Sequence, residues 1–205
     1  MEATPRIELG MEVLQTSALP LGYVAPGPSS SILPSASSIT GGPLGCAAVS
    51  DQAFRDAMAR LPSGVVVVSA KSGDGYRGLT ASTLVSISLE PPMVLVGLER
   101  TSSTRTAVAS TKAFNVNLLT RDQEFIADRF AGRAPAIDLR WQTLPHRIGH
   151  DGIPLIDGCA AWLECRLVQL HEAGDHDICV GEVTAAEIGS GEPLILWDRS
   201  FWTLR

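Results

Sequence analysis

The chain has 205 residues, of which 45% are hydrophobic, 19% charged and 5% aromatic, the composition of a globular protein with one ordinary domain. A formal net charge of −6 and a pI of about 5.2 argue against a general attraction to nucleic acid or to an anionic membrane surface. The longest strongly apolar runs, 65–68 and 93–98, are far shorter than the roughly 18 residues that span a bilayer, so no membrane segment is expected.

The first 50 residues differ in composition from the rest of the chain. They hold six proline, six glycine and eight serine residues, with Arg6 as the only basic and Tyr23 as the only aromatic residue. Such a segment buries too little apolar surface to offset the entropy lost on ordering. Its acidic residues and scattered prolines also argue against a secretory signal. We expect 1–50 to be a disordered extension. The alternative is that an upstream start codon was wrongly chosen, with Met11 as another possible start. Residues 51–205 are expected to form the folded domain.

The first half of that domain predicts a short helix followed by strands. Apolar residues at three- and four-residue spacing indicate a helix capped by Asp51 that continues through Arg60, and Pro62 ends it. Valine-rich or alternating runs bounded by turn residues predict strands at 64–70, 78–84, 85–89 and 93–98, the first two joined by a turn at 72–76. Strict alternation in the third run places Ser86 and Ser88 on one face.

The second half predicts further strands and two more helices. We expect helices at 102–110 and 122–130, strands at 113–119, 160–172 and 178–188, a final aromatic-rich run at 194–204, and mostly irregular chain from 132 to 157. Six or seven short strands with a few small helices are typical of a mainly antiparallel, closed or nearly closed β-barrel. Regular βαβ alternation is missing, and neither GxGxxG nor GxxxxGK[ST] occurs, so a nucleotide is not expected to bind in a Rossmann or P-loop manner.

The cysteine and histidine spacings predict no metal site. The four cysteines (Cys46, Cys159, Cys165 and Cys179) contain no CxxC pair, and the histidines show no HExxH or zinc-finger spacing. The last three cysteines lie in apolar alternating segments, which favours reduced, buried thiols. A cytoplasmic protein is the expectation that follows.

Hydroxyl and guanidinium groups gather in two segments, 78–88 and 100–105. Short hydroxyl donors, backbone amides at a helix start and positive charge are what a phosphate site requires. The alternative is that Ser and Thr are simply common where strands meet loops. Both interpretations stay open on spacing alone.

Three other polar residues have a structural and a functional interpretation. Asn115 and Asn117 lie in an otherwise apolar strand, where an amide usually satisfies hydrogen bonds in the core; a flat heteroaromatic ligand is the functional alternative. His176 follows Gly-Asp in a hairpin turn and, taken alone, is more often an exposed turn residue than a catalytic one. No nucleophile elbow, carboxylate pair or Ser/His/Asp arrangement supports hydrolysis.

Six motifs in order nevertheless resemble one family. They are Gly78-Leu-Thr-Ala-Ser-Thr83, Val85-Ser-Ile-Ser-Leu-Glu-Pro-Pro92, Phe114-Asn-Val-Asn-Leu118, Ala161-Trp-Leu-Glu-Cys165, Ala173-Gly-Asp-His176 with Val180-Gly-Glu-Val183, and Pro193-Leu-Ile-Leu-Trp197. Together they resemble the flavin reductase-like family, and more narrowly the NADH-dependent reductase component of two-component flavin monooxygenases. The resemblance runs from about Phe54 to Leu204.

The resemblance implies a Greek-key-like split β-barrel that forms homodimers and binds FMN or FAD near the subunit interface. The flavin site it implies comprises Thr80, Ala81, Ser82, Thr83, Ser86, Ser88, Ser102, Ser103, Thr104, Arg105 and Asn117. Asp175 and His176 are implied to contact NADH or NADPH, with His176 as the one candidate catalytic residue. An additional carboxylate, Asp177, stands where the family commonly has a neutral residue, and we expect it to disfavour NADH or to raise the pKa of His176.

The activity implied is hydride transfer from NADH to the flavin, which needs no acid or base from the protein. Reduced flavin would then pass to a separate oxygenase. Two alternatives are a non-enzymatic flavin- or haem-binding barrel, and an oxidase that retains its flavin. The sequence does not distinguish FMN from FAD or NADH from NADPH, and it does not identify the oxygenase or its substrate.

Overall fold

A computed structural model of the chain describes residues 48–73, 75–131 and 141–204. Its helices are α2 (Asp51–Met58), α3 (Ser103–Thr111) and α4 (Glu124–Phe130), with the 3-10 turns η1 (Arg121–Gln123) and η2 (Trp141–Thr143). Its strands are β1 (Ser63–Gly64), β2 (Val66–Ser72), β3 (Gly75–Ala81), β4 (Leu84–Leu89), β5 (Pro92–Glu99), β6 (Ala113–Leu118), β7 (His146–Ile148), β8 (Pro154–Ile156), β9 (Ala161–Ala173), β10 (His176–Ile188), β11 (Ile195–Trp197) and β12 (Ser200–Trp202). The expected disordered extension, apart from its last three residues, lies outside the described residues, as does Cys46.

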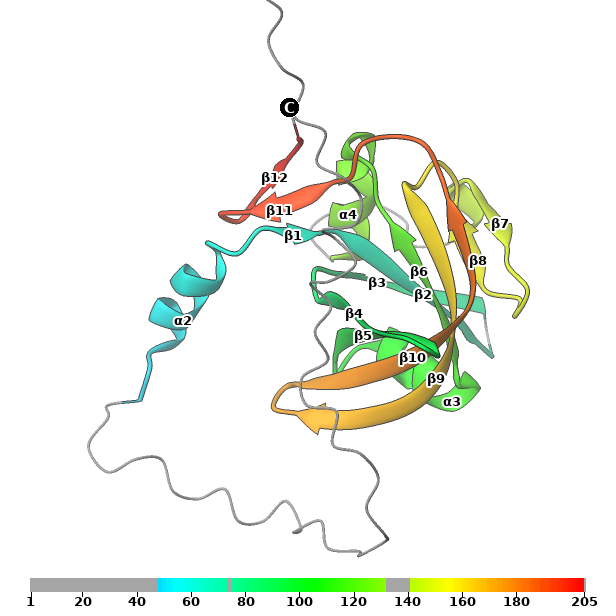
Figure 1. Ribbon diagram of the computed structural model, residues 1–205, viewed down its shortest axis with the longest axis horizontal. Helices are drawn as coiled ribbons and strands as arrows, with labels where there is room; N and C mark the ends of the chain where they lie inside the picture. The colour runs from blue at the N-terminus through cyan, green and yellow to red at the C-terminus, as the bar shows by residue number, and fades with distance from the viewer. Residues whose placement is uncertain (1–47, 74, 132–140, 205) are drawn as a thin grey trace, which may run out of the picture.

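The fold is mainly β, as predicted, and its centre is a seven-stranded antiparallel sheet (Figure 1). The strand order is β3-β2-β6-β9-β10-β5-β4, so β3 and β4 form the two edges. Two smaller sheets accompany it, β1-β11-β12 and β7-β8. Within 132–157, which was expected to be mostly irregular, the described residues 141–157 contain the short strand pair β7-β8, whereas 132–140 lie outside the described residues.

Strand β2 contributes to two apolar clusters because both of its faces are buried. Val66, Val68 and Ala70 pack in one cluster with α3 and with β5, β6, β9 and β10. Val67 and the preceding Val65 pack in a second cluster with α4, η2 and β8. A strand that is covered on both faces reads as a continuous apolar run rather than as an alternating one. This explains the valine run in the sequence.

Helix α2 lies apart from the seven-stranded sheet (Figure 1), and its Asp56 pairs with Arg199 in the turn between β11 and β12. The backbone N–H of Asp198 in that turn donates to the carbonyl of Ala59 at 2.8 Å. None of the residues of α2 is buried, and its apolar side chains remain exposed. Its cap is Ser50, whose Oγ accepts the N–H of Ala53 at 3.2 Å, and not Asp51 as predicted.

Strand β4 contains a β-bulge that changes the expected orientation of its serines. Ser86 pairs with Val94 of β5, whereas Ser88 pairs with the adjacent Met93, so Ile87 is the extra residue. Directly paired residues lie on the same face of a sheet, and consecutive residues of β5 point to opposite faces. Ser86 and Ser88 therefore lie on opposite faces, and the prediction that they share one face is wrong.

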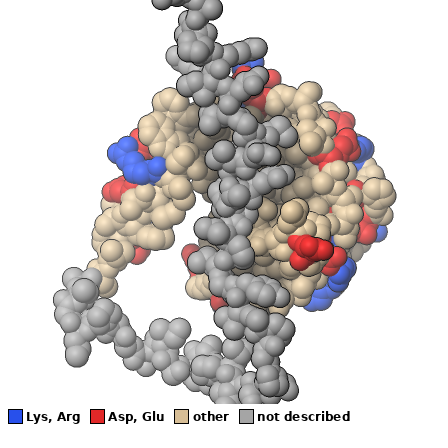
Figure 2. Space-filling model, viewed as in Figure 1, with Lys and Arg blue, Asp and Glu red and all other residues tan. Residues whose placement is uncertain are grey.

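The surface carries no large region of one charge on the side shown in Figure 2. Lys and Arg side chains occur there in small groups with Asp and Glu, and most of the uncovered surface between them is neutral.

No helix within the described residues is long and apolar enough to cross a membrane.

Candidate functional site

The junction between β3 and β4 contains residues 80–83, the first segment of the predicted flavin site. Thr80 directs its hydroxyl inward, where Oγ1 donates to the carbonyl oxygen of Ala127 in α4 at 2.6 Å. Ala81 is buried in the core, whereas Ser82 and Thr83 are exposed between the two strands. The hydroxyls of this segment that face solvent are therefore those of Ser82 and Thr83.

A cavity of about 670 Å³ opens beside Ser82 and Thr83. Its walls come from the β3–β4 junction, from α2 and from the β11–β12 turn: Phe54, Arg55, Met58, Ala59, Leu61, Pro62, Ser63, Gly64, Ser82, Thr83, Leu84, Val85, Leu196, Trp197, Asp198 and Arg199. Small-molecule sites usually measure roughly 300–1,000 Å³ and combine apolar walls with a few polar groups. This cavity has that character.

The N-terminus of α3 holds the second predicted group of hydroxyls. Ser102 caps the helix, because its Oγ accepts the backbone N–H of Arg105 at 3.1 Å. Ser103 is exposed, but Thr104 is only 1% exposed. Of the three hydroxyl residues expected to contact a phosphate here, Thr104 is thus the one that solvent does not reach.

Asn117 has the structural role that was left open for it. Its side chain is fully buried in β6, where Nδ2 donates to the carbonyl of Val67 at 3.0 Å and to Oγ of Ser69 at 3.1 Å. Its Oδ1 accepts the N–H of Ile156 at 2.7 Å. Both polar groups of the Asn117 amide are therefore engaged inside the protein.

The turn between β9 and β10 places Asp175 and His176 at an exposed tip. Gly174 and Asp175 form the two-residue connection, and Gly174 has φ = 68°, a conformation that suits glycine. The Asp175 carboxylate accepts from Nδ1 of His176 at 2.7 Å, and this hydrogen bond lowers the pKa of Asp175 below its usual value. With Nδ1 so engaged, Nε2 of His176 is the ring nitrogen left for a ligand.

Strand β5 brings the junction and the tip to one side of the sheet. The N–H of Gly97 donates to the carbonyl of Thr83 at 3.4 Å, and two residues further along β5, Glu99 pairs with His176. A Cβ on Gly97 would lie 3.4 Å from Cβ of Thr83, so the glycine leaves room beside that side chain. Thr83 and His176 are two strands and two residues apart, roughly 12 Å given standard sheet spacings.

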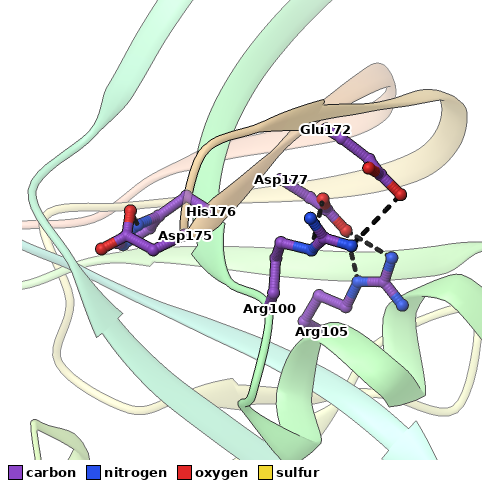
Figure 3. Close-up of polar contacts among 6 residues, drawn as sticks. All are labelled: Arg100, Arg105, Glu172, Asp175, His176 and Asp177. Atoms are coloured by element: carbon purple, nitrogen blue, oxygen red, sulfur yellow. Dashed lines mark hydrogen bonds and ion pairs between the residues drawn. The ribbon is translucent and has the colours of Figure 1, made fainter.

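Asp177 lies on the face opposite to His176 (Figure 3). Its carboxylate is fully buried and pairs with the guanidinium of Arg105, whose Nε donates to Oδ2 at 2.5 Å. Arg105 therefore has a protein partner, and the carboxylate of Asp177 is not beside the imidazole that it was expected to influence. Strand alternation could have indicated this separation, but the pairing with a residue 72 positions away could not be read from the sequence.

The cysteines in the described residues are free and buried, as expected. Burial raises the pKa of Cys159 and of Cys165 to about 12, and that of Cys179 to about 11. Neutral, inaccessible thiols are poor nucleophiles. The described cysteines therefore offer no covalent catalysis.

Comparisons with known proteins identify the family of the chain. Residues 58–205 match the family described as flavin reductase like domain. The chain is 37% identical to an NADH-dependent FMN reductase of Agrobacterium fabrum over 73% of its own length and 84% of the relative's. It is also 37% identical to the reductase component of 4-hydroxyphenylacetate 3-monooxygenase of Thermus thermophilus, covering 73% of this chain and 94% of the relative.

A solved structure shows the same similarity in three dimensions. The NADH:FAD oxidoreductase SgcE6 of Streptomyces globisporus, in complex with NAD and FAD fragments, superimposes with a TM-score of 0.70 at 31% identity, covering 75% of this chain and 92% of that one. The resemblance inferred from the six sequence motifs is thereby confirmed. The chain belongs to the flavin reductase-like family.

Proposed function

We propose that this chain is an NADH-dependent flavin reductase that reduces FMN or FAD and releases it to a separate oxygenase. The observation that supports the proposal most is the placement of Thr83 and His176 on one side of the sheet, next to β5, in a chain of this family. Relatives named as an FMN reductase and as a monooxygenase reductase component support the same activity.

The residues at the β3–β4 junction fit a flavin. Ser82 and Thr83 present exposed hydroxyls beside a cavity of about 670 Å³, and the neighbouring Gly97 has no side chain beside Thr83. In the proposed site these hydroxyls donate to the polar edge of the ring and to the ribityl chain. Ser102 and Ser103 at the start of α3 are assigned to the phosphate side, where the helix N-terminus favours an anion. Ser86 and Ser88 lie on opposite faces, so at most one of them lines the ring.

The nicotinamide side is assigned to Asp175 and His176. Bound NADH and flavin supply the hydride donor and acceptor, so the protein's task is to bind and align the two rings. The hydrogen bond to Asp175 fixes the orientation of the His176 imidazole, and Nε2 can then bind NADH. No acid or base is required of the chain for this reaction. The absence of reactive thiols among the described cysteines is compatible with it.

We assign the seven-stranded sheet to the split β-barrel of the family and the active form to a homodimer. β3 at one edge of the sheet contacts β5, which lies next to the other edge, as expected for a sheet that curls toward closure. Edge strand β4 exposes Val85, Ile87 and Leu89 at 48%, 37% and 89%. Exposed apolar side chains on an unpaired edge favour association with another chain, and a second copy would cover them.

The remaining assignments follow from the composition and the family. Residues 51–205 are the proposed catalytic domain, and 1–50 the extension that is not needed for it. A reducing cytoplasmic environment suits the free thiols of the described cysteines. Neither nucleic acid nor membrane is a proposed partner.

Consumption of NADH by the purified protein, followed by absorbance in air, tests the proposal. The rate is expected to be negligible without flavin and to rise on addition of FMN or FAD, because the flavin acts as a second substrate. A rate that is independent of added flavin would instead indicate a retained cofactor. Flavin binding with no NADH or NADPH oxidation would contradict the proposal and favour a non-enzymatic binder.

A further inference from the structure

The tip of the β9–β10 hairpin is attached to the domain through charged groups rather than through apolar packing. Among residues 171–177, Asp177 is the only one that is buried. Its neighbour across the ladder is the fully buried Leu98 of β5, so its carboxylate lies at the border of the apolar core. A carboxylate in such a place is stable only when it is paired and hydrogen-bonded.

Two arginines from the β5–α3 segment supply that pairing (Figure 3). Arg105 binds Oδ2 of Asp177 through Nε and Nη2, and its side chain is 26% exposed. Nε of Arg100 lies 3.8 Å from Oδ1, which accepts no hydrogen bond within the described part of the chain. Arg100 also donates from Nη2 to Glu172 of β9 at 3.2 Å. The positive charges of two guanidinium groups from the β5–α3 segment thus offset the negative charges of two carboxylates, one on β9 and one on β10.

The same arginine segment holds the residue that orients His176. The backbone N–H of Arg100 donates to the carbonyl of Asp175 at 3.0 Å, and the Asp175 side chain binds the His176 imidazole at 2.7 Å. A continuous series of contacts therefore connects Asp177, Arg100, Asp175 and His176. These contacts limit where the imidazole at this exposed tip can lie.

We propose that Asp177 is a positioning residue for NADH: its pairing with Arg105 and Arg100 holds the hairpin tip so that His176 meets the nicotinamide cofactor. The inference rests on the proposed function, because it requires His176 to contact NADH. It also explains why an acidic residue is tolerated here, since Asp177 faces the arginines and not the cofactor. Arg105 is then a structural partner of the hairpin and not a ligand of the flavin phosphate.

The test is a mutant cycle on the full-length protein with flavin saturating. We expect Asp177→Asn to raise the KM for NADH about fivefold, the change that accompanies loss of one ordering hydrogen bond, with kcat and flavin affinity within about twofold. His176→Ala is expected to raise the same KM. In the His176→Ala background, Asp177→Asn should have no additional effect on the KM, because the group that it positions is gone. A general loss of structure would not produce that non-additivity.

Glu182→Gln is the matched control, because Glu182 lies on the same strand and forms a more exposed ion pair with Arg166. It should leave the KM for NADH within about twofold, as expected of surface pairs. If Asp177→Asn does not fold, Arg100→Gln takes its place, because Arg100 is 42% exposed and its loss leaves the Arg105–Asp177 pair intact. Arg100→Gln should also raise the KM for NADH, by about twofold to threefold.

The outcomes separate this inference from the function on which it rests. An unchanged KM for NADH in His176→Ala would overturn the proposed cofactor contact itself. A raised KM in His176→Ala, with Asp177→Asn or its replacement equal to the control, would overturn only the positioning role. Equal effects of Asp177→Asn with and without His176 would also overturn it.

Discussion

Strands β6 and β4 have almost the same sequence pattern but differ in solvent exposure. Both alternate apolar with small polar residues, Phe114-Asn-Val-Asn-Leu118 in β6 and Val85-Ser-Ile-Ser-Leu89 in β4. In β6 the asparagines are fully buried, whereas in β4 the apolar residues Val85, Ile87 and Leu89 are exposed. The difference lies in the strand order, since β6 is between β2 and β9 while β4 is an edge.

The comparison shows that the position of a strand in the sheet decides whether its side chains are buried or exposed. In β6, the amide of Asn117 donates to the carbonyl of Val67 and the hydroxyl of Ser69, both on the neighbouring strand β2. It also accepts the N–H of Ile156 in β8, so it becomes an internal hydrogen-bonding centre. In β4, one side of the ladder has no partner within the described residues, so the apolar side chains are available to a second chain. Substitutions in β6 should therefore act on stability, and substitutions in β4 on association.

Asn117→Ala gives the largest expected effect. The substitution would remove the side-chain amide that hydrogen-bonds to the buried N–H of Ile156 and to the carbonyl of Val67. This loss should lower the free energy of unfolding by about 3 kcal/mol. Urea denaturation measures the change, with Ser88→Ala in β4 as the control, expected within about 0.5 kcal/mol of wild type. A folded, fully stable Asn117→Ala protein with impaired flavin affinity would show that Asn117 serves the ligand instead.

Leu89→Asp is expected to act on association. A charge on this 89% exposed side chain should halve the molar mass measured by light scattering, and weaken flavin binding about tenfold if the site needs the second copy. Ile188→Asp is the matched control, because Ile188 is 90% exposed on β10 and is not part of the β4 edge. A wild-type monomer, or a dimer that survives Leu89→Asp, would remove β4 from the interface.

The buried thiols should show the smallest effect. A pKa of about 11 to 12 leaves Cys159, Cys165 and Cys179 protonated near neutral pH, and the folded chain also shields them. In a Cys46→Ser variant, a thiol reagent should therefore label no cysteine and should leave the NADH oxidation rate unchanged until the protein is unfolded. Labelling of the native variant together with loss of activity would contradict the burial of these side chains.

Local patterns predicted much of the fold. The valine run and the long alternating segments of β9 and β10 specify strands by themselves, and Gly-Asp specifies the turn between them. The bulge at Ile87 was missed because it depends on pairing with β5, and the short strands β7 and β8 because each is only three residues long. The cap at Ser50 differs from the predicted Asp51 by one residue, within the usual uncertainty of helix ends.

The sequence motifs identified the segment of the candidate site but did not predict which of its side chains are buried and which are exposed. The motifs identified Thr80–Thr83, yet packing against α4 turns Thr80 inward and leaves Ser82 and Thr83 exposed. The pairing of Arg105 with Asp177 depends on two elements distant in sequence, so a free arginine at the start of α3 was the natural expectation. Burial and long-range pairing are properties of the fold that spacing alone does not reveal.

The most direct test of the account measures initial rates of NADH consumption over a matrix of NADH and flavin concentrations. We predict that the double variant Ser82→Ala, Thr83→Val raises the KM for flavin about tenfold and leaves that for NADH within about twofold, whereas His176→Ala does the reverse. Such a split would place the two cofactors at the β3–β4 junction and at the hairpin tip. If both proteins lose affinity for both substrates alike, or for neither, the assignment of the two sites is contradicted.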